Sequence, residues 1–565
     1  MKSLRLGFTV SALLCGLLLG HSPAASAYSH GDSLVRWHDY SKDAFVKAEK
    51  EGKPVFMLIT AVWCYWCHVY EEKSLETKQV SSYLNEHYVP VFVDYDERKD
   101  IARKYPATGL PTTVIFAPDG EELISLPGYI PVDKLMTGLR NTVDYVKNEY
   151  RPRGEEQEVR EAAKMVVPGK AALERYVKDF LKLVTSYYDS AYGGIGTRQK
   201  YPNAAEFLRL LEYYEESGEK KWLDMVTNTV DHMAGFSQKR PESRRPAFEE
   251  LVKLRARERS DIDAVARLQT DDVFVGIYDA VEGGFFRYAT RRDWTIPHYE
   301  KILSDNAELA LLFLNAYRVT DRQRYRSVAE KTLHYVLTTL YDEEAGRFYG
   351  SQDADEVYYH FTAAERARVE PPHVDRNSYA FSNAQMASTL LRAAAVLGDE
   401  RYAEAGRRAL EFIRKELLTD YGVLSYYDHK DGRAHINGNI EPNAWAALAF
   451  LEAYGLTGEK SYLESAGKVL DFALEHLYDG ESGGFFERRS TDDAYYRPGE
   501  LFVDEKPLEE NGVMAYALYL AYEATGDEDY LLRARQTLGV FVGSIREYSP
   551  YLHRLSARLL ARAGE

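Results

Sequence analysis

The chain has 565 residues, of which 45% are hydrophobic and 28% are charged. This length exceeds what one hydrophobic core usually organises, so we expect at least two domains. The formal net charge of −17 argues against nucleic acid and anionic membranes as partners, because an acidic surface is repelled by both.

The N-terminus has the pattern of a secretory signal. Lys2 and Arg5 precede an uncharged apolar run over 6–20, and small residues at 25–27 form a cleavage site. We therefore predict that residues 1–27 are a signal peptide and that the protein is exported, to the periplasm or outside the cell. Cleavage removes two basic residues and no acidic ones, which changes the net charge from −17 to −19.

The alternative is an uncleaved N-terminal anchor. Cys15 follows Leu14 rather than a small residue, which argues against a lipid-anchored form. No later stretch of the sequence is long and apolar enough to cross a bilayer, so we expect no membrane contact once the signal is removed.

Residues 28–150 are predicted to form an α/β domain. Apolar runs at 54–60 and 89–94 have the continuous hydrophobic pattern of buried parallel strands. Further strands are expected over 110–116 and 123–126, joined by the Asp119-Gly120 turn, and helices over 78–87, 100–105 and 132–150. This order, with a Cys-x-x-Cys pair directly after the first strand, resembles a thioredoxin fold.

Cys64 and Cys67 are the two cysteines of the mature chain. A lone pair at this spacing in an exported protein indicates a working dithiol rather than a structural disulfide. A helix N-terminus stabilises a thiolate, so we expect Cys64 to be the nucleophile and Cys67 the resolving thiol. The resemblance to thioredoxins further implies a cis peptide at Pro111, beside the dithiol, where the substrate chain docks.

Four neighbours are assigned to the support of this redox site: Trp63, His68, Glu71 and Pro111. His68 either tunes a thiol pKa or is an exposed polar residue. Many thioredoxins carry an acid where this chain has Leu58, so Glu71 is the candidate proton donor, the alternative being a solvated helix carboxylate. Cys-x-x-Cys-His also matches c-type haem attachment. We expect no haem, other cofactor or metal, because the flanking strand and the Pro111 loop differ from those of a cytochrome.

After a linker over 151–164, residues 165–565 are predicted to be helical and repetitive. Short Gly- or Asp-containing joints, such as 218–222 and 398–402, alternate with Gly-rich turns, such as 282–286 and 482–486. Twelve periodic helices are expected, beginning at 170, 203, 220, 262, 302, 322, 380, 400, 442, 460, 508 and 528, with a tail at 550–562. Six hairpins predict an (α/α)6 barrel whose long loops form a cleft at one mouth. Residues 236–261 interrupt the repeat and are interpreted as an exposed insertion.

Longer motifs make a family recognisable. They are Gly276-Ile277-Tyr278-Asp279, residues 283–288 and 293–301, Asp305-Asn306-Ala307, residues 351–355 and Lys200-Tyr201-Pro202. These motifs resemble those of the spermatogenesis-associated protein 20-like family. The resemblance implies a thioredoxin-like domain joined to a six-hairpin (α/α) barrel. The chain differs from the family at Tyr65, where His is common, and around Pro111, which is closer to an ordinary thioredoxin.

The barrel offers a second set of candidates. Carbohydrate chemistry requires a positioned pair of acids or histidines, and an aromatic ring can stack on a sugar. The candidate cleft residues are Asp293, Trp294, His298, Glu300, Asp305, Asp353, Asp355 and Glu441. The alternative is that these residues cap helices, form turns and pack the core.

Three functional hypotheses follow. The first is a thiol-disulfide oxidoreductase that acts on protein thiols or disulfides, with a barrel that binds a partner or ligand. The second is a carbohydrate-active or glycan-binding barrel with an accessory thioredoxin domain. The third is a scaffold whose cleft holds a peptide.

Overall fold

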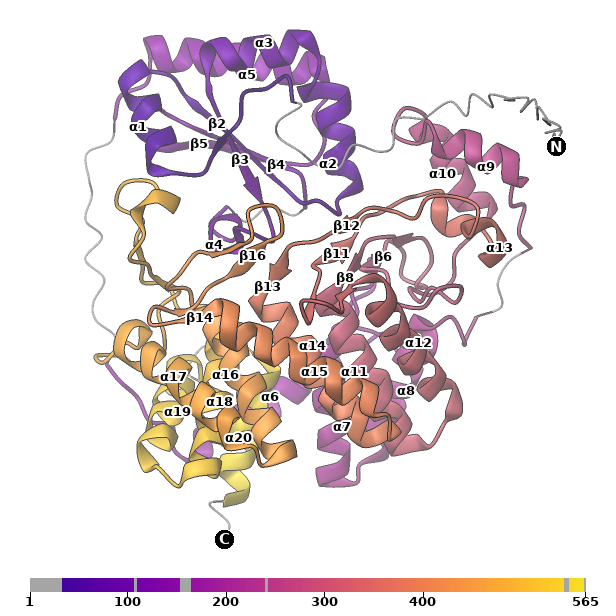
Figure 1. Ribbon diagram of the computed structural model, residues 1–565, viewed down its shortest axis with the longest axis vertical. Coiled ribbons are helices and arrows are strands. Elements are labelled where there is room, and N and C mark those ends of the chain that lie inside the picture. The colour runs from indigo at the N-terminus through magenta and orange to yellow at the C-terminus, as the bar shows by residue number, and fades with distance from the viewer. Residues whose placement is uncertain (1–32, 106–108, 153–163, 239–241, 543–547, 563–565) are drawn as a thin grey trace, which may run out of the picture.

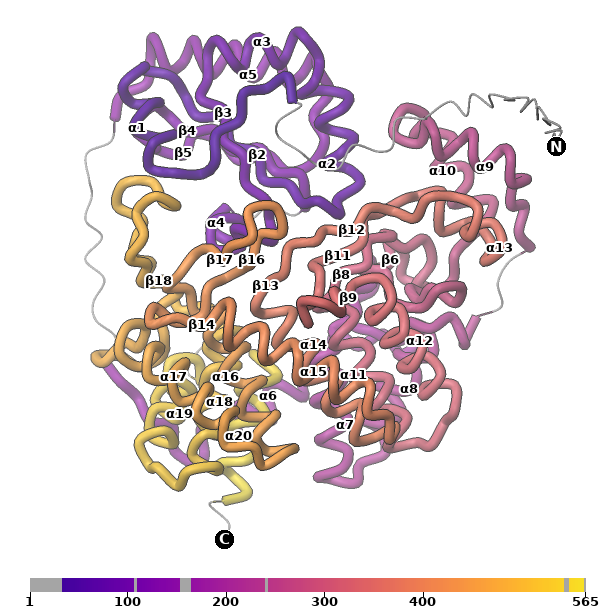
Figure 2. The backbone as a smooth tube through the Cα atoms, viewed as in Figure 1, coloured from indigo at the N-terminus to yellow at the C-terminus, as the bar shows by residue number. Residues whose placement is uncertain are grey.

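The computed structural model describes residues 33–105, 109–152, 164–238, 242–542 and 548–562 (Figure 1). The predicted signal peptide, and residues 153–163 of the predicted linker, lie outside the described residues. Among the described residues, no helix combines the length and the apolar character needed to cross a membrane. The protein is multidomain, with an α/β thioredoxin-like domain seated on one end of an all-α barrel (Figures 1 and 2).

The N-terminal domain is built on a five-stranded sheet in the order β1-β3-β2-β4-β5. Strands β1 and β2 are parallel to β3, whereas β4 runs antiparallel to both β2 and β5. The strands are β1 (His38–Asp39), β2 (Val55–Thr60), β3 (Val89–Asp94), β4 (Thr112–Phe116) and β5 (Glu122–Pro127). The helices are α1 (Lys42–Glu51), α2 (Tyr65–Tyr70), its π-helical continuation Glu71–Leu75, α3 (Lys78–His87), α4 (Lys99–Ala102) and α5 (Val132–Asn148).

The two faces of this sheet have different neighbours. On one face, Phe56 and Leu58 of β2 pack with α3 and α5 in a core that belongs to this domain alone. On the other face, Val55, Met57 and Ile59 belong to a cluster of buried side chains that continues into the barrel. A strand with both faces buried reads as a continuous apolar run, which explains the pattern at 54–60.

The helical region forms a closed double ring. The inner helices are α7 (Ala204–Ser217), α11 (Leu303–Thr320), α14 (Ala380–Leu397), α16 (Ile440–Thr457), α18 (Leu508–Thr525) and α20 (Pro550–Arg562), each packed on the next. The outer helices are α8 (Lys220–Met233), α12 (Gln323–Thr339), α15 (Glu400–Phe412), α17 (Lys460–Phe472), α19 (Glu528–Phe541) and α6 (Lys170–Tyr187). Helices α15 and α17 each end in a π-helical turn, Ile413–Leu417 and Ala473–Leu477.

The membership of the ring differs from the sequence-based prediction. The segment 550–562, expected to be a tail, is the sixth inner helix, α20, and it packs against α6, α7 and α18. The helix expected over 262–277 is the shorter α10 (Ile262–Asp271), which lies outside the ring. The first and last helices of the region therefore form the sixth hairpin, a pairing between distant segments that local periodicity does not reveal.

The insertion also differs from its predicted exposed state. It contains α9 (Phe248–Arg255), where Leu251 and Leu254 are buried. The backbone carbonyl of Glu258 accepts a hydrogen bond, 3.2 Å long, from the Tyr65 hydroxyl of the thioredoxin-like domain. The insertion is therefore packed beside the thioredoxin-like domain.

The long loops at one end of the ring carry short strands and face the thioredoxin-like domain (Figure 1). The strands are β6 (Tyr288–Ala289), β7 (Pro297–His298), β8 (Lys301–Ile302), β9 (Tyr341–Asp342), β10 (Arg347–Phe348), β11 (Ser351–Gln352), β12 (Val374–Asp375), β13 (Ser378–Tyr379), β14 (Leu418–Thr419), β15 (Gly422–Val423), β16 (Tyr426–Asp428), β17 (Arg433–His435), β18 (Arg488–Arg489) and β19 (Phe502–Val503). A short helix, α13 (Ala363–Arg366), completes this end.

The repeated sequence motifs correspond to repeated loop anchors. Lys301 is fully buried, and its ammonium group donates to Asp279 and to the Gly283 carbonyl, both at 2.8 Å. Asn306 of α11 bonds both the N–H and the carbonyl of Phe285. The same arrangement recurs in the pairs Asp189–Lys200 and Asp479–Lys506 and in Asn511. These motif residues are therefore structural, because they satisfy buried backbone groups where each long loop meets its inner helix.

Candidate active site

The dithiol lies at the start of α2, directly after β2. Cys64 is the N-cap of α2 and is bonded to Cys67 in a disulfide. The Cys67 N–H donates to the Cys64 sulfur at 3.2 Å, so a backbone donor is in place to stabilise a thiolate there. Cys64 is 4% exposed and Cys67 is fully buried. The predicted nucleophile, Cys64, is thus the cysteine nearer to solvent.

Residues from both domains cover the cysteines. Leu110, whose peptide bond to Pro111 is cis as predicted, packs against them. Tyr95 and Ile302 complete the same cluster. Ile302 belongs to β8, at the entrance to inner helix α11, so the barrel contacts the dithiol directly.

A barrel loop is also bonded to the active-site segment. The Ala354 N–H donates to the Trp63 carbonyl at 3.3 Å. His68 lies with Nε2 2.9 Å from the Val62 carbonyl and 3.1 Å from a carboxylate oxygen of Asp353. His68 is thus buried at the interface rather than exposed, and Asp353, predicted as a cleft residue, instead holds the two domains together.

Trp63 is held from two sides. Its indole N–H donates to Asp96 at 2.5 Å, and the Arg287 guanidinium lies over its ring, 4.4 Å from the centroid. Trp63 is 1% exposed, so it forms a rigid wall next to Cys64.

A cavity of about 550 Å³ opens between the domains beside Cys64. Its wall in the thioredoxin-like domain includes Cys64, Trp66, Tyr95, Arg103 and Leu110. Its wall in the barrel consists of Tyr201, Arg287, Tyr288, His298 and Glu300. The volume is within the usual range for small-molecule sites.

His298 and Glu300, two of the candidate cleft residues, lie in this cavity. His298 Nδ1 is 3.4 Å from a carboxylate oxygen of Glu300. Burial disfavours the charged imidazole, but the Glu300 carboxylate more than offsets it and raises the pKa of His298. Burial likewise disfavours the Glu300 carboxylate, but His298 lowers its pKa below the ordinary value. The two side chains form an ion pair in the wall facing the dithiol.

Glu71, the candidate for proton transfer to Cys67, has a partly buried side chain at the end of α2. It is one turn after Cys67, where α2 changes to π-helical geometry, and the Thr60 hydroxyl donates to it at 3.5 Å. Burial raises the pKa of Glu71 to about 8. The carboxyl therefore holds a proton at neutral pH, unlike a solvated helix carboxylate.

Four predicted cleft residues have other roles. Trp294 is fully buried and donates to the Tyr192 carbonyl at 2.8 Å, so it packs the core and is not a stacking platform. Asp293 accepts from the Thr295 hydroxyl at 2.6 Å in a local turn. Asp355 pairs with Arg255 at 2.6 Å, and Glu441 with Arg103 at 2.8 Å. The three carboxylates among them cap turns or join segments, because nearby arginines and hydrogen-bond donors match their charges.

Asp305 lines a second cavity, of about 340 Å³, at the barrel mouth. Three further carboxylates share it: Glu206, Glu308 and Glu509. Burial raises the pKa of Asp305 to about 6 and that of Glu509 to about 7, and raises the pKa of Glu308 well above its ordinary value.

The sequence-based prediction missed Arg287, Tyr288 and Tyr201 as site residues. All three lie within the family motifs, but nothing in their local pattern shows that they face the dithiol. Arg103, also missed, pairs with Glu441 and Glu510 across the interface.

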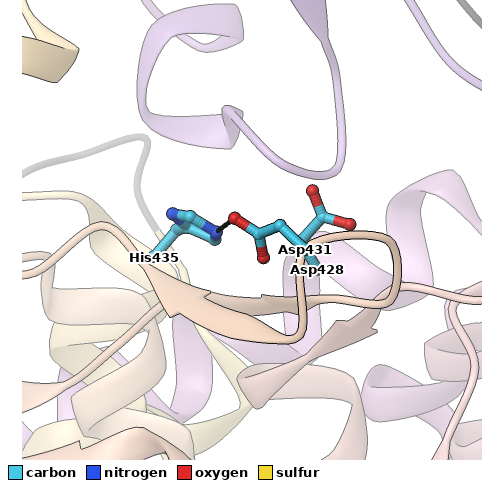
Figure 3. A group of neighbouring side chains, drawn as sticks. All are labelled: Asp428, Asp431 and His435. Atoms are coloured by element: carbon cyan, nitrogen blue, oxygen red, sulfur yellow. Dashed lines mark hydrogen bonds and ion pairs between the residues drawn. The ribbon is translucent and has the colours of Figure 1, made fainter.

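One group among the described residues has the geometry for a metal: Asp428, Asp431 and His435, on the β16–β17 hairpin (Figure 3). Their candidate ligand atoms lie within 4.8 Å of one another. His435 already contacts Asp431 at 3.0 Å and the Tyr495 hydroxyl at 2.8 Å. Both ring nitrogens therefore have hydrogen-bond partners without an ion.

Comparison with known proteins agrees with this architecture. Residues 19–168 match a family model described as "Thioredox_DsbH: Protein of unknown function, DUF255". Mouse spermatogenesis-associated protein 20 is 27% identical over 89% of this chain and 66% of its own length. The human protein is 23% identical over 96% of this chain and 80% of its own length. The chain is thus similar to spermatogenesis-associated protein 20 over most of its length. It spans about two thirds of the length of the mouse relative.

Among solved structures, the barrel is similar to that of cellobiose 2-epimerase from Bacillus thermoamylovorans, with a TM-score of 0.51 and 10% identity over 70% of this chain and 100% of the epimerase. A sugar epimerase from a ruminal bacterium matches with a TM-score of 0.51 and 11% identity, over 70% of this chain and 98% of that one. At this identity the similarity establishes the six-hairpin fold alone.

Proposed function

We propose that this protein is an exported thiol-disulfide oxidoreductase whose dithiol works inside a covered cavity. The observation that carries the proposal is the Cys64–Cys67 pair, at a helix N-terminus, on the wall of the interdomain cavity. The thioredoxin-like fold and the family-model match support a redox role for this domain.

The chemistry follows from the positions of the groups. In the reduced protein, the Cys64 thiolate attacks a substrate disulfide and forms a mixed disulfide, and one half of the substrate leaves as a thiol after taking up a proton. The Cys67 thiolate then attacks the Cys64 sulfur and releases the second half of the substrate as a thiol. The protein is left oxidised, with a Cys64–Cys67 disulfide. Cys67 loses its thiol proton before this attack, and the Glu71 carboxylate, whose pKa burial raises to about 8, is the base that we assign to take it up.

The test uses the reduced full-length protein and bis(2-hydroxyethyl) disulfide, an uncharged substrate small enough for the cavity. We expect single-turnover reduction by the parent protein and none by the Cys64→Ser variant. The Cys67→Ser variant should stop at a mixed disulfide, visible as an added half-substrate mass. The double Cys→Ser variant is the control. A parent protein that neither reacts nor forms the adduct would refute the proposal.

The burial of Cys64 limits which partners can reach the dithiol. Because Cys64 is 4% exposed and covered by the barrel, a protein thiol or disulfide reaches it only as an extended segment. We propose no nucleic-acid partner and no membrane contact, since the charge is strongly acidic. Export to the periplasm or outside the cell is tested by fractionating cells that express the full chain or a chain without residues 1–27.

A second function is favoured by the mouth cavity with its four carboxylates. Acids whose pKa values are raised to different extents are what sugar chemistry uses as proton donor and base. In this alternative the barrel binds or modifies a carbohydrate. Thermal-shift assays with a panel of sugars test this alternative. Glu308→Gln is the test variant, and His298→Ala probes the other cavity. No sugar-dependent shift in the parent protein would eliminate it.

A further inference from the structure

Arg287 is the feature of the interdomain cavity that the proposed redox role does not explain. Its guanidinium lies over the Trp63 ring, one residue before Cys64. In the part of the chain that the structure describes, no carboxylate or carbonyl accepts a hydrogen bond from Arg287. An arginine has five N–H donors, and leaving them unused in a partly buried wall is costly.

Arg103 provides a contrast on the opposite wall. Its guanidinium pairs with Glu441 at 2.8 Å and with Glu510 at 2.5 Å, so its donors are engaged in joining the domains. Among the described residues, no hydrogen-bonded carboxylate holds Arg287, although the Glu300 and Asp305 charges act on it, so its N–H donors are available to a ligand. A guanidinium in this position suits the planar, two-oxygen geometry of a carboxylate.

The wall beside Arg287 has the complementary charge. Glu300 is 2% exposed and paired with His298 through one carboxylate oxygen, while its other oxygen has no hydrogen-bond donor. The rings of Tyr201, Tyr288 and His298 stack face to face in sequence, with centroids 4.7 and 4.4 Å apart, and form an aromatic column in the same wall as Glu300. Available donors and an available acceptor therefore lie in one small cavity with the dithiol.

We propose that the substrate of the dithiol is a small disulfide or thiol of the amino-acid or short-peptide type, bound through its carboxylate by Arg287 and through its ammonium group by Glu300. This assignment deepens the proposed function and rests on it. The electron balance is that of disulfide exchange: the Cys64–Cys67 dithiol loses two electrons and two protons, and one bound disulfide becomes two thiols. The aromatic stack supplies a surface for the apolar part of the ligand.

The experiment compares three small disulfides as single-turnover oxidants of the reduced full-length protein. Cystine carries carboxylates and ammonium groups, cystamine carries ammonium groups alone, and bis(2-hydroxyethyl) disulfide is neutral. Each rate constant is divided by that of dithiothreitol with the same disulfide, which removes intrinsic reactivity. We expect cystine to be favoured over the neutral disulfide by about 10- to 100-fold, the range for a charged hydrogen bond.

The variant Arg287→Gln should lose the preference for cystine over the neutral disulfide. Arg291→Gln, which changes an exposed arginine four residues away, is the matched control and should retain it. Equal normalised rates for cystine and the neutral disulfide in the parent protein would overturn the substrate assignment alone. No reaction with any disulfide would overturn the redox function as well. If Arg287→Gln changed a sugar-dependent thermal shift but no disulfide rate, the cavity would belong to the barrel's ligand and the assignment would be wrong.

Discussion

At the scale of single residues, the proposed redox site depends on side chains whose environment departs from what their type suggests. Glu71 is a charged residue by sequence, yet burial raises its pKa to about 8. His68 is buried against Asp353, and Trp63 is fixed by Asp96. Thr60, Asp353 and Asp96 contact these side chains, so each has a defined position near the cysteines.

The first prediction at this scale concerns Glu71→Gln. We expect the step in which Cys67 resolves the mixed disulfide to slow by about 100-fold, the low end of what general acid–base catalysis contributes. In the parent protein, the resolving rate should rise as pH increases through about 8, since Glu71 becomes a carboxylate there and can accept the Cys67 proton. Stopped-flow tryptophan fluorescence with rapid acid quenching measures this step.

Glu72→Gln is the control, because Glu72 is exposed on the same turn. A resolving rate in Glu71→Gln that matches the control at every pH would show that another group carries the proton.

At the scale of elements, the docking of the two domains buries acidic side chains on both sides. Glu97, between β3 and α4, accepts from the Asn377 amide at 2.7 Å and lies near Asp375 of β12. Burial, with the Asp375 charge second, raises the pKa of Glu97 to about 8, and burial raises that of Asp375 to about 7. The interface is therefore most stable when these carboxyls are protonated.

This arrangement predicts a loss of stability with rising pH. Both pKa values are raised in the folded state, so between about pH 4.5 and pH 8 the folded chain holds more protons than the unfolded chain. The stabilisation is complete at the acidic end of this range and is lost as pH rises through the folded pKa values. We expect Glu97→Gln to recover about 1–2 kcal/mol at alkaline pH, after allowance for partial solvent screening.

Thermal and urea unfolding, measured from about pH 6 to about pH 9, test this expectation. Glu49→Gln, on exposed α1 surface, should leave the pH slope unchanged. An identical slope in Glu97→Gln and the parent protein would contradict it.

At the scale of the whole molecule, the barrel acts as a cover for the dithiol. Ile302 packs against the cysteines, and the loop at Asp353 and Ala354 is bonded to the active-site segment. The sheet face that carries Val55 shares one core with the barrel, so the cover is part of the folded unit.

This cover predicts size-selective access to Cys64. In the reduced native protein, iodoacetamide should alkylate Cys64 readily. A long polyethylene-glycol maleimide should react with the native protein roughly 10-fold or more slowly than with the urea-unfolded chain. Gel shift and mass spectrometry measure the two reactions. Equal accessibility of native and unfolded protein to the large reagent would mean that the domains separate freely in solution.

Much of this architecture could be predicted from the sequence because its signals are local. Apolar runs and turn residues defined the strands of the thioredoxin-like domain, and the repeated Gly joints defined most helices of the ring. The Cys64–Cys67 pair and the cis peptide at Pro111 were likewise predicted and are present. Trp294 was wrong as a ligand platform, since its type is compatible with both a binding surface and a core.

The sequence by itself determined the identity of the two folds, the dithiol and its place after β2, because periodicity and short-range spacing encode them. Only the tertiary structure decided that α20 closes the ring against α6, that Arg287 and His298 line one cavity with Cys64, and that Glu71 is partly buried. These facts depend on contacts between segments hundreds of residues apart, and the free energy of such packing leaves no mark in the local pattern of either segment.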